Sequence, residues 1–121
     1  MSYLLLINEP VGQREARTEA EGRAAYAAMV AFGERLAAAG QLAAVESLSG
    51  LDTAVRISHA DGRLLRRDGP FAEAKEMIGG FFLLKNVTRD EALSIAQGCP
   101  AAAWATVELR ALAPCFENSL G

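Results

Sequence analysis

Residues 68–76, with the sequence DGPFAEAKE, gather four charged side chains around a glycine, a proline and an aromatic ring. The segment does not alternate like a strand and is too short for an ordinary helix. It therefore predicts a rigid polar loop, which is where functional groups concentrate on a scaffold. Asp68 is the candidate catalytic base of this loop, and Glu73 and Lys75 are candidate ligand-binding residues. Lys75, between Glu73 and Glu76, places opposite charges that can hold a group ready for proton transfer.

A purely structural interpretation of the same loop stays open. Turn aspartates such as Asp68 accept hydrogen bonds from backbone N–H groups two or three residues further on. Gly69 permits a positive φ, and Pro70 is suited to open a helical turn. On this interpretation Asp68 caps the turn and takes no part in chemistry.

Three other charged positions could contribute to a site. Glu46 interrupts the apolar run 42–48, and because a charge on such a strand needs a partner or water, it either faces solvent or acts as a general base in a cleft. Glu108 and Arg110 lie two residues apart on a predicted strand, which favours a same-face ion pair, although Arg110 could instead bind an anionic ligand through its fork of donors. His59, the only histidine, lies beside a predicted hairpin turn and is expected to be solvated.

Composition excludes several classes of function. The net charge of −3 and the lack of a basic tract exclude nucleic acid as a partner. No window approaches the roughly 20 apolar residues of a membrane span, and a cytoplasmic location is expected. Cys99 and Cys115 have neither metal nor redox spacing, so two free thiols are expected. No metal site and no cofactor is predicted, because zinc spacings, phosphate loops and Ser/His/Asp signatures are missing.

The 121 residues predict a single domain across positions 1–121, with a tail after about residue 113. Capping boxes at Thr18 and Thr88 predict two helix starts, and Asp61-Gly62 predicts a hairpin turn. Residues 8–17 are expected to form a loop. The predicted strands are residues 3–7, 42–48, 53–58, 63–66, 80–84 and 104–112.

This order of elements predicts an α+β fold, a ferredoxin-like βαββαβ unit with an inserted β-hairpin. Its antiparallel sheet would carry two helices on one face. The other face has no helices of its own, and the mean hydropathy of +0.14 suggests apolar surface that a partner covers. A homodimer that packs sheet against sheet is therefore expected, with a cleft for a small polar or anionic molecule.

Residues 68–76 together with Gly79-Gly80 resemble the signature of the YCII-related family, in its DGPF-type branch. The strand 3–7, the Asp61-Gly62 turn, Cys99-Pro100 and residues 107–110 are similar as well. The resemblance implies a ferredoxin-like subunit of a dimeric α/β barrel in the bacterial cytosol. It leaves the reaction undefined. It also implies an alternative, a non-catalytic regulatory protein linked to an alternative sigma factor.

Some YCII-related proteins carry a histidine and an aspartate as a proposed catalytic pair. His59 has no match to that histidine, whereas Asp68 is the residue most readily carried over. Ala111 stands where a proline commonly follows the last arginine of the family pattern.

Overall fold

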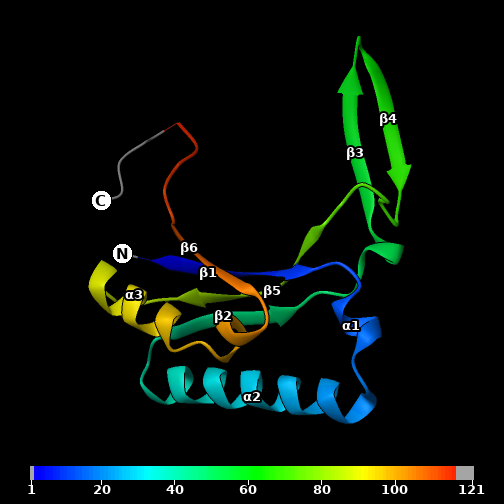
Figure 1. Ribbon diagram of the computed structural model, residues 1–121. Helices are drawn as coiled ribbons and strands as arrows, with labels where there is room; N and C mark the ends of the chain where they lie inside the picture. Colours follow the sequence, from blue (N-terminus) through cyan, green and yellow to red (C-terminus); the bar gives the residue numbers. More distant parts are fainter. Residues whose placement is uncertain (1, 117–121) are drawn as a thin grey trace.

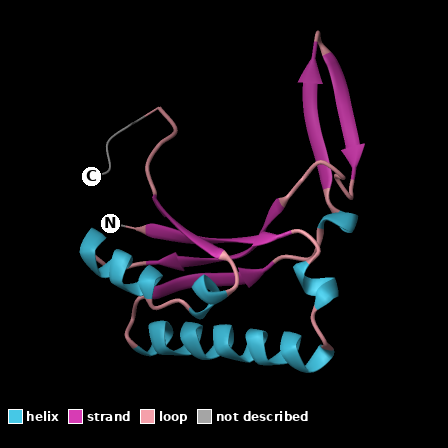
Figure 2. Ribbon diagram, viewed as in Figure 1, coloured by secondary structure: helices cyan, strands magenta, loops and turns pink. Residues whose placement is uncertain are grey.

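The computed structural model describes residues 2–116 and shows a four-stranded antiparallel sheet in the order β2-β5-β1-β6, with helices on one face (Figure 1, Figure 2). The sheet strands are β1 (Tyr3–Pro10), β2 (Leu42–Ser47), β5 (Glu76–Leu84) and β6 (Thr106–Ala111). The helices are α1 (Gln13–Ala16), α2 (Glu19–Ala38) and α3 (Arg89–Gln97), with 3-10 turns η1 (Leu51–Thr53) and η2 (Pro100–Ala103). This arrangement confirms the predicted ferredoxin-like α+β fold.

Both predicted capping boxes are present. Thr18 Oγ1 accepts a hydrogen bond from the Glu21 N–H, and the Glu21 carboxylate accepts one from the Thr18 N–H, so two free donors at the start of α2 are satisfied. Thr88 and Glu91 repeat the arrangement at the start of α3. In both glutamates the carboxyl pKa lies below its ordinary value, mainly because the carboxylate accepts the hydrogen bond from the threonine backbone N–H, with a smaller contribution from the threonine side chain.

Two predicted boundaries are wrong. β1 continues to Pro10 and is followed by α1, where a loop over residues 8–17 was expected, and β5 begins at Glu76 instead of Gly80. The extra residues pair with one another, from Asn8 opposite Ile78 to Pro10 opposite Glu76. β6 pairs with β1 only as far as Asn8, so the side of β1 toward β6 is open at Pro10, and a proline is tolerated there.

The two faces of the sheet differ in their cover. Tyr3 and Leu5 of β1 face the helices and are buried, as are Phe82 and Leu84 opposite them on β5. Phe82 meets Phe32 of α2 edge to face, with ring centroids 5.2 Å apart. The other face has no helix, and its apolar side chains are half-buried; they are Leu4, Leu6, Phe81 and Leu83.

A hairpin of β3 (Val55–Ala60) and β4 (Arg63–Asp68) stands away from the sheet, on the side opposite the helices (Figure 1). Its turn confirms the prediction, since Asp61 and Gly62 adopt φ values of 52° and 75°. All residues of both strands are exposed, among them the apolar side chains of Val55, Ile57, Leu64 and Leu65. Because isolated two-stranded hairpins are marginal in water, this one needs support at its base or along its side.

No helix within residues 2–116 is long and apolar enough to cross a membrane.

Candidate functional site

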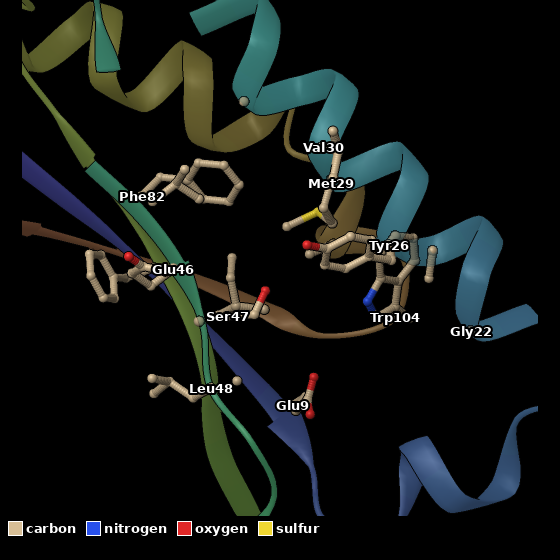
Figure 3. A pocket seen from close by; sticks show the side chains of 18 of the residues that line it. Glu9, Gly22, Tyr26, Met29, Val30, Glu46, Ser47, Leu48, Phe82 and Trp104 are labelled. Atoms are coloured by element: carbon tan, nitrogen blue, oxygen red, sulfur yellow. The ribbon is translucent and has the colours of Figure 1, made fainter. Parts of the chain in front are cut away.

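A cavity of about 660 Å³ lies between α2 and the helix-facing side of β2 and β5. Met29, Tyr26 and Trp104 form one wall, and Phe82 and Ser47 lie opposite them (Figure 3). The Tyr26 side chain at the mouth is 62% exposed although it lines the cavity. A cavity of this size with mostly apolar walls and a few polar groups is typical of a small-molecule site.

Glu9 supplies the charge at the end of this cavity. It is only 5% exposed, because β1 directs it to the helix-facing side of the sheet, in line with Tyr3, Leu5 and Ile7. Arg14 Nε lies 2.5 Å from Glu9 Oε1, so the two charges pair. Yet within residues 2–116 no donor is aligned for a hydrogen bond to that oxygen. A buried carboxylate normally receives hydrogen bonds, so Glu9 has unused capacity to accept one.

Arg14 is held in place from several sides. Its Nη1 donates to the Leu48 carbonyl at 2.8 Å, and its Nη2 donates to the Gly79 carbonyl at 3.3 Å. The short helix α1 thereby ties Leu48, directly after β2, and Gly79 within β5 to Glu9 on β1. Gly79 leaves the room for this arrangement, because a Cβ there would lie 2.7 Å from Glu9 Oε2 and 2.8 Å from Arg14 Nη2.

The mouth of the cavity is organised around Trp104. Gln13 Nε2 donates to the Trp104 carbonyl at 2.7 Å, and Arg17 Nη2 donates to Gln13 Oε1 at 3.2 Å. The Arg17 guanidinium also lies 5.5 Å from the centroid of the Trp104 ring, within cation–π range. The result is a second cation at the entrance, beside an indole that is fixed at its backbone.

The predicted loop residues do not lie at this cavity. Asp68, Glu73, Lys75 and Glu76 are exposed, and none of them lines it. Asp68 Oδ1 accepts a hydrogen bond from Arg66 Nε at 3.0 Å, so its observed partner is a side chain of the hairpin.

The expected helical turn at Pro70 is absent, and Gly69 does not have positive φ. The glycine is needed for another reason: its N–H donates to the Ala54 carbonyl at 2.7 Å, and a Cβ would overlap the Leu51 carbonyl.

The loop instead forms the base of the hairpin. Phe71 is buried, and the Arg56 guanidinium lies 3.8 Å from the centroid of its ring. Glu73 accepts two hydrogen bonds from Arg67, at 2.5 and 2.7 Å, and lies 3.4 Å from Arg56. The Arg67 hydrogen bonds are the main reason why the pKa of Glu73 falls to about 2. This cluster of Arg56, Arg67, Phe71 and Glu73 supports β3 and β4 where they leave the body of the protein.

The remaining candidates lie on other surfaces. Glu46 borders the cavity, but its register opposite Phe81 directs its side chain to the helix-free face, away from Met29 (Figure 3). Arg110 Nη1 lies 3.3 Å from Glu108 Oε2 on that same face, which confirms the same-face ion pair, and it borders a shallow recess. His59 is exposed on β3.

Sequence reasoning missed Glu9 and Arg14 because both lie in the segment expected to be a loop. The available signal was the alternation Tyr3, Leu5, Ile7, which places the next member, Glu9, on the same buried face if the strand continues. Within residues 2–116, no group of three or more His, Cys, Asp or Glu side chains is arranged to hold a metal ion.

Fold and cavity together define a ferredoxin-like α+β protein with a helix–sheet cleft. The chain belongs to the YCII-related domain family, whose model matches residues 1–115. An uncharacterized protein of Rhizobium meliloti (strain 1021), R00369, is 31% identical over 97 residues, which cover 80% of this chain and 78% of that protein.

Among solved structures, the chain is similar to the 5-chloro-2-hydroxyhydroquinone dehydrochlorinase TftG from Burkholderia phenoliruptrix AC1100, in complex with 2,5-dihydroxybenzoquinone. The TM-score is 0.53 at 18% identity, and the match covers 98% of this chain and 100% of TftG. At this identity the likeness establishes a shared fold.

Proposed function

We propose that this YCII-related protein is a homodimer that binds a small polar or anionic molecule in the cavity between α2 and the sheet. The observation that carries the proposal is the Glu9–Arg14 pair at the end of a cavity with apolar walls. Arg17 provides positive charge, since the charge of Arg14 is paired with Glu9, while Met29 and Phe82 provide contact area for the apolar part of a ligand. The TftG structure, which holds a small cyclic molecule on the same fold, supports binding of this kind.

The apolar side chains on the helix-free face of the sheet support the proposed dimer. Leu4, Leu6, Phe81 and Leu83 form a continuous apolar patch there, since Leu4 pairs with Leu83 and Leu6 with Phe81. A second copy that packs on this patch would remove it from water, and the two hairpins would flank the interface because each stands on that side (Figure 1). Acid–base catalysis by Asp68 or Glu46 stays a prediction, and neither carboxylate points into the cavity.

A second candidate is an interaction protein without catalysis, for example one linked to an alternative sigma factor. The exposed apolar side chains of the hairpin, Ile57 at 59% and Leu64 at 63%, favour it because they offer a surface to a protein partner. On this alternative, changes to the hairpin would remove the partner while the cavity would stay irrelevant.

Native mass spectrometry of gently purified protein tests the first candidate. We expect a dimer that carries a reproducible extra mass. Gly22 of α2 lines the cavity, and a Cβ there would meet nothing within 4 Å, so Gly22→Phe should place a ring in the cavity and obstruct binding without disturbing the backbone. The extra mass should disappear in Gly22→Phe and persist in the matched control Gly22→Ala. A mass that survives in Gly22→Phe would contradict binding in this cavity.

A further inference from the structure

We infer that Glu9 is the residue that selects the ligand, and that the ligand is a flat ring bearing a hydroxyl group that donates its hydrogen bond to the Glu9 carboxylate. This inference rests on the proposed function, because it names the chemical class of the molecule that the cavity takes. Two separate features of the site carry it: the hydrogen-bonding state of Glu9 and the composition of the walls.

The Glu9 carboxylate can accept a further hydrogen bond. It is 5% exposed, and Arg14 Nε at 2.5 Å neutralises its charge without an aligned hydrogen bond to Oε1. Arg14 cannot turn to improve this contact without losing its bonds to the carbonyls of Leu48 and Gly79. An ionised carboxylate accepts hydrogen bonds and donates none, so a ligand group beside Glu9 must carry an O–H or N–H.

The walls favour a flat ring over a branched or extended chain. On α2, Gly22 and Gly33 carry no side chain, so Tyr26 and Met29 project further into the cavity than the helix surface on either side of them. Trp104 lies next to Tyr26, and both face Phe82 across the cavity (Figure 3). Aromatic rings that border one slot from two sides are suited to stack on, or pack edge to face with, another ring.

A hydroxyl at Glu9 also fits the charges. A neutral O–H donor keeps the Glu9–Arg14 pair intact, whereas an ammonium group would compete with Arg14, and a second carboxylate would be repelled by Glu9. Arg17 beside Trp104 remains available for a negative or polar substituent of the ring. The site therefore combines a hydroxyl acceptor, apolar walls and a second cation.

Three probes separate these features in the wild-type protein. Resorcinol has the ring and the donors, its dimethyl ether has the ring without donors, and the corresponding cyclohexanediol has the donors without a flat ring. Trp104 is the only tryptophan and lines the cavity, so its fluorescence reports binding, and calorimetry provides the affinities. We expect resorcinol to bind at least about ten-fold more tightly than its dimethyl ether, because it alone makes the charged hydrogen bond. It should bind about two- to ten-fold more tightly than the cyclohexanediol, because only a flat ring stacks on the aromatic walls.

Glu9→Gln keeps the shape of the side chain and removes the charged acceptor. The preference for resorcinol over its dimethyl ether should shrink to about three-fold or less in this variant. Glu15→Gln is the matched control, since Glu15 is an exposed glutamate of the same short helix as Arg14 and does not line the cavity. It should keep the full preference. If Glu9→Gln does not fold, the comparison of the three probes on the wild type decides alone.

Equal affinity for resorcinol and its dimethyl ether, lost for both in Gly22→Phe, would overturn the role of Glu9 and leave the proposed cavity intact. Equal affinity for resorcinol and the cyclohexanediol would overturn the flat ring. Failure of all three probes would overturn the ligand class, while the extra mass on the native dimer would still report on the proposed function by itself.

Discussion

Gly79→Ala tests whether the Glu9–Arg14 pair depends on the missing side chain of β5. The added Cβ would lie 2.7 Å from Glu9 Oε2 and 2.8 Å from Arg14 Nη2. Neither neighbour can move freely, because Glu9 is buried and Arg14 is bonded to two carbonyls. Inserting one methyl group into such a packed site costs about 1–3 kcal/mol.

Two further terms set the net magnitude. Alanine restricts the backbone of the unfolded chain more than glycine does, and this raises the free energy of unfolding by about 0.4–1 kcal/mol. The Arg14 side chain is 34% exposed, so we add no separate penalty for a weakened ion pair. A net destabilisation between about 0 and 2.6 kcal/mol remains, which corresponds to a melting temperature lower by up to roughly 10 °C for a domain of this size.

Urea denaturation followed by Trp104 fluorescence measures this difference, at one fixed protein concentration because the proposed dimer would be stabilised by mass action. Gly22→Ala is the control: nothing lies within 4 Å of its Cβ, and it should stabilise α2 by about 0.5–1 kcal/mol. If Gly79→Ala were more stable than the wild type, the glycine would not be holding space for the Glu9–Arg14 pair.

Three other outcomes are expected. Phe81→Glu places a charge on the helix-free face, so light scattering should show a monomer, and an intact dimer would contradict packing through that face. The pKa of Glu73 is lowered from 4.5 to about 2, so the ionised carboxylate stabilises the fold fully at pH values above 4.5. This stabilisation is lost as the pH falls from 4.5 to about 2. The difference in melting temperature between wild type and Glu73→Gln should therefore shrink over that range; a constant difference would show that the charge of Glu73 is irrelevant. Cys115 is exposed, whereas Cys99 is buried and burial raises its pKa, so iodoacetamide should label Cys115 first in a mass spectrum, and equal labelling would refute the burial of Cys99.

Local rules predicted most elements of this fold. The capping boxes at Thr18 and Thr88 and the turn at Asp61-Gly62 each depend on a few neighbouring residues, and all three are present. The prediction that Glu108 and Arg110 share a face of β6 was also correct, since these positions pair with Leu6 and Leu4 of β1 in an unbroken register. Signals of this kind are strong because the residues that create them are adjacent in the chain.

The cavity depends on contacts between residues that are far apart in the sequence, which patterns of neighbouring residues do not predict. Arg14 meets the carbonyls of Leu48 and Gly79, which are 34 and 65 residues away. Its helix, Gln13–Ala16, is too short to display helical periodicity, and the polar character of the segment suggested a loop.

The signature segment and the cavity meet at Gly79-Gly80. Residues 68–76 build the base of the hairpin, through Phe71 and Glu73, and take no part in the cavity. The two glycines that follow lie in β5, where Gly79 leaves space for Glu9 and Arg14, and Gly80 brings the backbone of β2 close. One continuous stretch of chain thus fixes the direction of the hairpin with its first half and shapes the cavity with its last two residues. If the hairpin lies along a second subunit, as the proposed dimer requires, binding in the cavity and contact between subunits are connected through a single rigid strand.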